Sequence, residues 1–177
     1  MCNRLFQYET NIAPFRKLLT ESFAGKEDCF VYRTIQDIPP NSEDNCPVVL
    51  RESNVGRRIP RIYTQEEVDR MSPEKQLREL GKFGLSVNDS PKAAIDSCLS
   101  TYQRLKDKGA SPDDLETYKK NRGMLVGRFK FSSDCGVLTD FINNHANIFL
   151  FEGVSLEDIR DKDFSPLTII YPSDDES

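Results

Sequence analysis

The chain has 177 residues, of which 37% are hydrophobic and 30% charged, and its 24 Lys and Arg against 29 Asp and Glu give a net charge of −5. Leu, Ile, Val and Phe make up about a quarter of the residues, above the roughly one fifth below which charged chains are usually disordered. No apolar run approaches the roughly 18 residues of a transmembrane helix, and the first residues lack the apolar core of a signal peptide. We therefore expect a folded, soluble, intracellular domain, cytoplasmic or nuclear.

The first third of the chain predicts one helix and three short strands. Residues 14–24 carry an apolar stripe at helical spacing, and residues 29–35 are β-branched and aromatic, as in a strand. Residues 47–50 and 58–63 are weaker strand candidates, and residues 37–47 predict an exposed loop because they are polar and contain prolines.

Residues 64–128 predict a helical middle segment. Ser-Pro pairs at 72–73, 90–91 and 111–112 favour helix starts, since Ser caps a helix and Pro fits its first position. Thr64 and Glu67 have the spacing of a capping box that opens a further short helix. The expected helices cover residues 64–81 with a restart at 73, residues 91–109 and residues 112–128.

The last third predicts a helix over residues 134–144, a strand over 147–151, a short helix capped by Ser155 and a strand over 167–171. The connection between the two strands is long enough for a parallel crossover. Together these elements predict an α/β or α+β fold with a small mixed sheet. We expect a single globular domain over residues 1–172, with its helical middle at 64–128, and an acidic tail over 173–177.

Motif searches remove most familiar enzyme classes. The nine glycines fit neither phosphate-binding pattern, and the sequence contains neither the metalloprotease HExxH pattern nor the hydrolase GxSxG pattern. The cysteines are widely spaced and His145 is the single histidine, so we predict no metal and no cofactor. Cys98 and Arg104 match a phosphatase spacing, but this segment is predicted mid-helix, where the backbone amides are already hydrogen-bonded.

Cys135 is the best candidate nucleophile, because the predicted 134–144 helix would place it at a helix N-terminus, where a thiol pKa is depressed. His145 would lie about 15 Å away at the other end of such a helix. The catalytic hypothesis therefore names Cys135 and His145, with a carboxylate such as Asp134 or Asp140, and competes with a purely structural role for both residues.

Charge is unevenly distributed along the chain. Residues 51–61 and 104–130 are net basic, whereas residues from 152 to the end are strongly acidic. Such segregation can produce a basic face on an acidic protein. The residues that we predict to contact an anion are Arg57, Arg58, Arg61, Lys119, Lys120 and Arg122.

The sequence leaves three functional hypotheses open. The first is a non-catalytic interaction or assembly protein, of regulatory or viral accessory type, that binds a protein partner or associates with copies of itself through its opposite charges. The second is binding of nucleic acid or another anionic surface through the basic face. The third is a small thiol-dependent enzyme that uses Cys135.

Overall fold

The computed structural model describes residues 4–21, 29–35 and 61–173. It has an α+β fold, in which helices surround a six-stranded sheet of order β4-β5-β2-β1-β3-β6. All described strand pairs are antiparallel. The strands are β1 Cys29–Ile35, β2 Leu85–Asn88, β3 Leu125–Phe131, β4 Gly136–Leu138, β5 His145–Leu150 and β6 Leu167–Thr168. The helices are α1 Glu9–Ile12, η1 Ala13–Phe15, α2 Arg16–Glu21, α3 Gln65–Asp69, α4 Pro73–Gly81, α5 Pro91–Asp107, α6 Pro112–Arg122 and α7 Leu156–Ile159.

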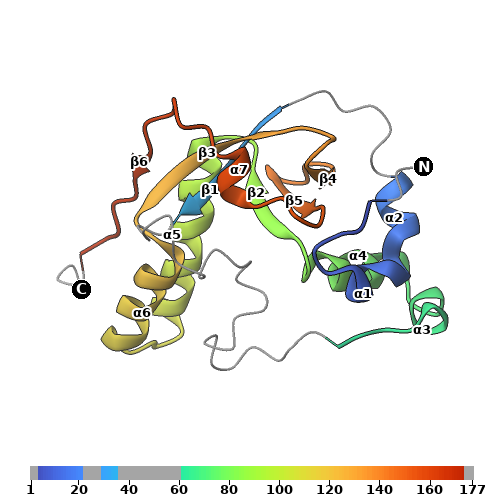
Figure 1. Cartoon of the computed structure of the whole chain (residues 1–177). Coiled ribbons are helices and arrows are strands. Elements are labelled where there is room, and N and C mark those ends of the chain that lie inside the picture. The colour runs from blue at the N-terminus through green and yellow to red at the C-terminus, as the bar shows by residue number, and fades with distance from the viewer. Residues whose placement is uncertain (1–3, 22–28, 36–60, 174–177) are drawn as a thin grey trace.

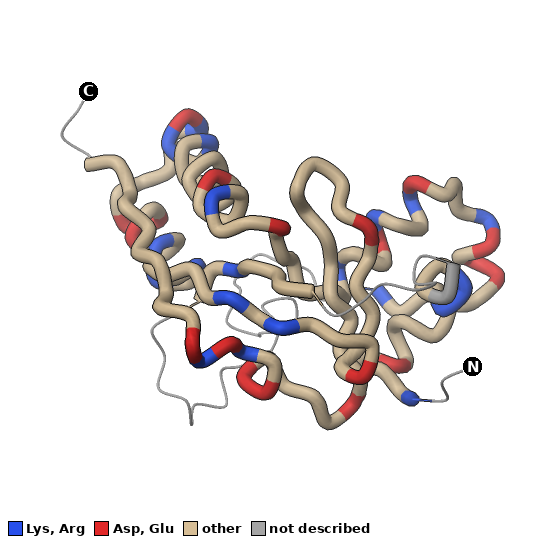
Figure 2. Tube along the Cα trace, turned by 90° about the horizontal axis from the view of Figure 1, so that it is seen from above, with Lys and Arg blue, Asp and Glu red and all other residues tan. Residues whose placement is uncertain are grey.

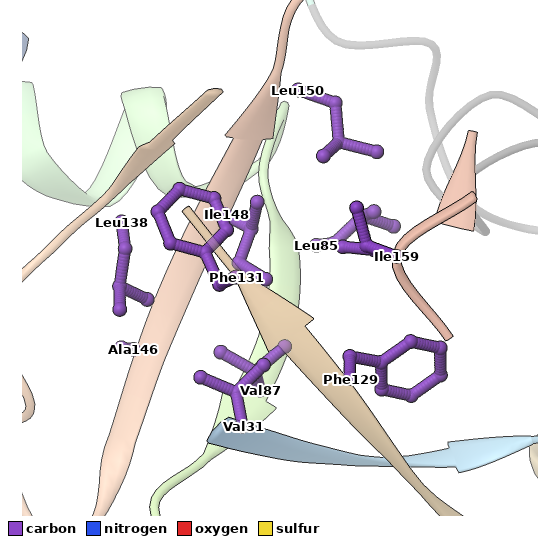
Figure 3. Close-up of a cluster of buried hydrophobic side chains, with 10 residues drawn as sticks. All are labelled: Val31, Leu85, Val87, Phe129, Phe131, Leu138, Ala146, Ile148, Leu150 and Ile159. Carbon is purple, nitrogen blue, oxygen red and sulfur yellow. The ribbon is translucent and has the colours of Figure 1, made fainter. Parts of the chain in front are cut away.

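One face of the sheet holds the largest apolar cluster. Alternate residues of each strand point to the same side, so one in two contributes to this face. Ile159 of α7 packs onto it, and Figure 3 shows the strand side chains spread over this face with Ile159 at one side of the cluster. The strand residues of the cluster are Val31, Leu85, Val87, Phe129, Phe131, Leu138, Ala146, Ile148 and Leu150.

The opposite face is covered by two separate groups of helices, which lie at opposite ends of the molecule in Figure 1. At one end, Ala94 and Cys98 of α5 pack against Val126 of β3 and Ile169. At the other end, the N-terminal helices, α3 and α4 bury a second cluster around Phe149 of β5. The strip of sheet between these two groups is polar.

Most predicted helix starts are confirmed. Capping boxes form at Thr64, Ser111 and Ser155, and the Ser72 and Ser90 side chains accept a hydrogen bond from the third backbone amide of α4 and α5. The strand at 29–35 is confirmed as β1, and the strand at 147–151 is confirmed as β5 with a shifted start. The N-terminal helix is broken into α1, η1 and α2 and begins earlier than predicted.

One predicted helix is too long, and another does not form. The helix expected over 112–128 ends at Arg122, because Gly123 adopts a φ of 88° that closes α6, and residues 125–131 form strand β3 between β1 and β6. The helix expected over 134–144 does not form, since Gly136–Leu138 pair with β5 as strand β4. A four-residue strand, β2, was not predicted at all.

The predicted parallel crossover is also wrong. β6 covers only Leu167–Thr168 and pairs antiparallel with β3, at the opposite edge of the sheet from β4. The strand predicted at 47–50 and most of the one at 58–63 lie outside the described residues, while residues 61–63 are not in a strand. Residues 174–177 of the predicted acidic tail are also outside them. Among the described helices, none has the length and apolar character needed to cross a bilayer.

Candidate functional site

A polar strip crosses the helix-covered face of the sheet between α4 and α5. Ser86 and Asn88 of β2 alternate with the buried Leu85 and Val87, so they point to the face opposite the main apolar cluster. Ser86 lies opposite Asn147 and Asn88 lies opposite His145 in the β2–β5 pair. These four side chains form what we call the polar strip: Ser86, Asn88, His145 and Asn147.

Hydrogen bonds and a tight turn hold the strip in place. The Ser86 hydroxyl is hydrogen-bonded to Nε2 of His145. Asn143 and Asn144 have φ values of 51° and 64°, and the backbones of Ile142 and His145 on either side exchange two hydrogen bonds of 2.9 and 3.1 Å. Two consecutive left-handed residues are typical of a type I′ turn, for which Asn is a favoured residue. The turn therefore places His145 at the first position of β5.

Two arginines from distant parts of the chain reach the α5 end of the strip. Arg33 of β1 donates a hydrogen bond from Nη1 to the Ser86 carbonyl oxygen, at 2.7 Å. Arg122 is the last residue of α6. Both line a cavity of about 20 Å³ that is also lined by Thr34, Ser86, Asn88, Ala94, Ser97 and Cys98. This volume is sufficient for one water molecule or for one oxygen atom of an anion.

The charge in this cavity is positive. Burial, together with the positive charge of Arg122, lowers the pKa of Arg33 to about 10. The same two causes lower the pKa of His145 below its usual value, so its imidazole is neutral at pH 7. Within the described part of the chain, no carboxylate forms an ion pair with Arg33 or Arg122. Two guanidinium groups therefore share a partly desolvated site with neutral hydrogen-bonding groups, which is favourable for an oxyanion.

A second cavity, of about 200 Å³, lies on the other side of the Ser86–His145 pair. It is bounded by the C-terminal half of α4 and by β5 with the turn that precedes it. Its mouth is apolar, because the side chains of Leu77 and Ile142 are exposed there. The lining residues are Leu77, Leu80, Gly81, Thr139, Asp140, Ile142, His145, Ala146, Asn147 and Phe149.

The four predicted anion-binding residues that the structure describes do not lie on one continuous face. Arg61 precedes α3, where it pairs with Glu67, whereas Lys119, Lys120 and Arg122 are on α6 at the other end of the molecule in Figure 1. Lys119 pairs with Glu116 at 2.7 Å, and Lys120 is exposed. Arg57 and Arg58 lie outside the described residues. Figure 2 shows acidic and basic residues intermingled along the helices at both ends.

Part of the attraction expected between the basic middle segment and the acidic C-terminal segment is used within a single chain. Asp161, in the acidic C-terminal segment, forms an ion pair of 2.7 Å with Arg128 of β3. The Arg128 guanidinium also lies over the rings of Phe30 and Phe164, at 4.4 and 4.8 Å from their centroids. This basic residue is therefore occupied inside the protein.

The structure separates the residues of the catalytic hypothesis. Cys135 lies in a turn before β4, where its thiol is hydrogen-bonded to Ser132, and its carbonyl oxygen accepts a hydrogen bond from Phe151. His145 is six residues before Phe151 along β5, or about 20 Å at 3.3 Å per residue. Asp134 lies beside Cys135, whereas Asp140 lines the second cavity. Among the described residues, no group of three or more His, Cys, Asp or Glu is placed to hold a metal ion.

Arg33 is the site residue that sequence reasoning missed, because it lies inside a correctly predicted strand, where we expected packing. The one signal available was a cation within an otherwise apolar and aromatic strand. Comparisons add no further information: no family model, no curated protein and no solved structure matches this chain.

Proposed function

We propose that this protein is a non-catalytic binding protein that recognises an oxyanion, such as a phosphate or carboxylate group, between Arg33 and Arg122. The observation that carries the proposal is that two arginines line one cavity and that neither forms an ion pair with a carboxylate among the described residues. The non-catalytic role comes from the first hypothesis drawn from the sequence, that of an interaction protein, and the anion comes from the second, that of binding to an anionic partner. The site, however, is more local than a basic face.

The loss of water around the two arginines explains why this cavity favours an anion. Each charge that loses water requires compensation, and two neighbouring cations repel each other as well. An oxyanion that inserts one oxygen into the cavity would compensate both guanidinium groups. Ser97 also lines the cavity and offers a hydroxyl donor to the remaining oxygens, and Asn88 offers the amide N–H that does not bond the Asn144 carbonyl.

The proposal is tested by titrating the protein with inorganic phosphate and sulfate at constant ionic strength while recording the melting temperature and the His145 ring signals. We expect phosphate to raise the melting temperature through binding to the folded state, and to raise the pKa of His145 by offsetting the charge of Arg122. Arg122→Gln and Arg33→Lys should weaken or abolish both effects. Lys120→Gln, which changes an exposed residue of the same helix, is the matched control and should leave both unchanged.

Phosphate and sulfate effects no larger than those of chloride in the unmodified protein would overturn the proposal. Equal effects in the Arg122→Gln and Lys120→Gln variants would overturn it too, because they would show diffuse electrostatic binding instead of a site.

A further inference from the structure

We propose that the ligand is a small amphipathic anion, an alkyl phosphate or a fatty carboxylate of medium length, whose apolar part occupies the cavity between α4 and β5. This inference rests on the proposed anion site and adds the chemical class of the ligand. The juxtaposition of the two cavities on one face of the sheet carries it.

The two cavities are neighbours across a single hydrogen-bonded pair. We call the cavity lined by Arg33 and Arg122 the arginine cavity, and the cavity between α4 and β5 the α4 cavity. Ser86 lines the arginine cavity, His145 lines the α4 cavity, and their side chains are hydrogen-bonded to each other. The arginine cavity adjoins β1 and β2, and the α4 cavity adjoins β5 and the start of the turn that follows β4. Since adjacent strands are about 4.8 Å apart, the cavities lie roughly two strand spacings, or about 10 Å, from each other. One extended molecule can therefore reach both.

The α4 cavity is suited to an apolar group. Leu80 and Phe149 form its buried wall, and Leu77 and Ile142 stand exposed at its mouth, 50% and 68% accessible. Large apolar side chains exposed beside a cavity commonly mark a ligand site. At about 30 Å³ for each group the size of a water molecule, 200 Å³ accommodates about six or seven methylene-sized groups. This capacity and the 10 Å separation both indicate a chain of medium length.

Asp140 and Asn147 set the polarity at the edges of the α4 cavity. Asn147 donates its backbone N–H to the Thr139 hydroxyl and accepts from the Thr139 backbone with its carbonyl, each at 3.0 Å, so its backbone groups are occupied. Asp140 disfavours a second anionic group in this cavity. The charge of the ligand is therefore directed to the arginine end and its apolar part to the α4 end.

A chain-length series tests the inference. Affinities for inorganic phosphate, butyl phosphate and octyl phosphate are measured by calorimetry below the concentration at which octyl phosphate forms micelles. Burying one methylene is worth about a fourfold gain in affinity, so octyl phosphate should bind about 200-fold more tightly than butyl phosphate. Octanoate, compared with octyl phosphate at equal chain length, distinguishes a carboxylate from a phosphate headgroup, and tight binding of either supports the inference.

Two surface variants locate the apolar part. Leu77→Ser and Ile142→Ser change exposed residues at the mouth, and each should reduce the gain from butyl to octyl phosphate while leaving the affinity for inorganic phosphate unchanged. Ile170→Ser is the matched control, since Ile170 is an exposed isoleucine, 82% accessible, near β6 at the other edge of the sheet.

The possible failures are distinguishable. Phosphate binding without a chain-length gain, or with a gain that Leu77→Ser and Ile142→Ser leave intact, overturns this inference and leaves the anion site standing. Octyl phosphate binding that is equally tight in Arg122→Gln overturns the bipartite ligand, because the apolar cavity would then act alone. Absence of any phosphate or alkyl phosphate binding overturns both proposals.

Discussion

Replacing Gly136 by Ala should destabilise the protein strongly, because β4 approaches β5 closely at this residue. A Cβ atom on Gly136 would lie 2.2 Å from the Phe149 carbonyl oxygen and 2.9 Å from Cα of Leu150, where real Cβ contacts essentially never fall below 3.0 Å. Both neighbours are backbone atoms, so no side-chain rotation can relieve the contact. The strands would have to move apart by roughly 1 Å, at a strain cost of about 1–3 kcal/mol.

The movement would also weaken the hydrogen bonds that flank Gly136. The Phe151 N–H donates to the Cys135 carbonyl at 2.9 Å, and the Thr139 N–H donates to the Asn147 carbonyl at 3.0 Å. With about 1 kcal/mol for their weakening, the expected loss in free energy of unfolding is about 2–4 kcal/mol. A domain of typical stability, about 5–15 kcal/mol, would still fold.

Urea denaturation provides the assay. With a slope of about 2 kcal/mol per M, Gly136→Ala should lower the unfolding midpoint by about 1–2 M. The matched control is Gly81→Ala at the end of α4, where the added Cβ would meet only the Asn147 side-chain nitrogen at an ordinary 3.4 Å. We expect this second variant to be neutral or stabilised by up to about 1 kcal/mol, since Ala is the better helix residue. A neutral Gly136→Ala variant, or equal losses in the two variants, would refute the close approach of β4 and β5.

Four further predictions concern charge, pH and capping. Asp161→Asn removes a half-buried ion pair with Arg128 and should lower the free energy of unfolding by about 1–2 kcal/mol. Asp96→Asn removes an exposed pair with Lys92 and should lower it by less than about 0.5 kcal/mol, and the urea midpoints of the two variants compare these losses. Burial, with the hydrogen bond to Cys98, raises the pKa of Tyr118 to about 12, whereas tyrosine in the unfolded chain has a pKa near 10. The free energy of unfolding should therefore decrease as the pH rises from 10 to 12, and Tyr118→Phe should flatten that decrease in denaturation curves. Burial and the charge of Arg122 lower the pKa of His145, so the free energy of unfolding should decrease as the pH falls below the unfolded histidine pKa, near 6.5. If His145→Gln showed the same decrease in stability at low pH, this reasoning would be wrong. Ser111→Ala should cost about 1 kcal/mol by removing the capping box of α6, measured against Ser100→Ala on the exposed face of α5.

Local signals in the sequence were sufficient to predict most of the helices. The cap at Ser90 and the apolar stripe that includes Cys98 and Tyr102 lie within one segment of chain, and both stripe residues are buried in α5. The same holds for β1, whose residue types favour a strand independently of its neighbours. Where the cap, the stripe and the stop signal agreed, the element was predicted with nearly correct ends.

The errors occurred where long-range pairing decides the conformation. β3 contains the helix-compatible residues Leu125 and Val126 and two charged residues, and what makes it a strand is its seven-residue pairing with β1, nearly a hundred residues earlier in the chain. β4 is similar, because β5 is the strand with which its three residues pair in the described part of the chain. Such pairings join residues that are far apart in the sequence, so no local pattern of residues reveals them.

The candidate site was difficult to predict for the same reason. Of its two cations, Arg122 was among the predicted anion-binding residues, because it belongs to a basic run with Lys119 and Lys120 that is visible in the sequence. Arg33 becomes significant only when β1 lies beside β2 and its guanidinium contacts the Ser86 carbonyl. The polar strip likewise requires the register that pairs Asn88 with His145. Each of these residues, taken alone, is an ordinary strand residue.

The polar strip itself is the feature that requires a functional explanation. A sheet face that is covered by helices is usually apolar, since each polar side chain placed there must find a hydrogen-bond partner or cost stability. Here Ser86 and His145 hydrogen-bond to each other, and each lines one of the two cavities on this face. Two arginines border one side of that pair, and an apolar mouth formed by Leu77 and Ile142 borders the other. A stable α+β core does not need this arrangement, whereas the ligand proposed above, with one charged end and one apolar end, would contact both sides of the pair.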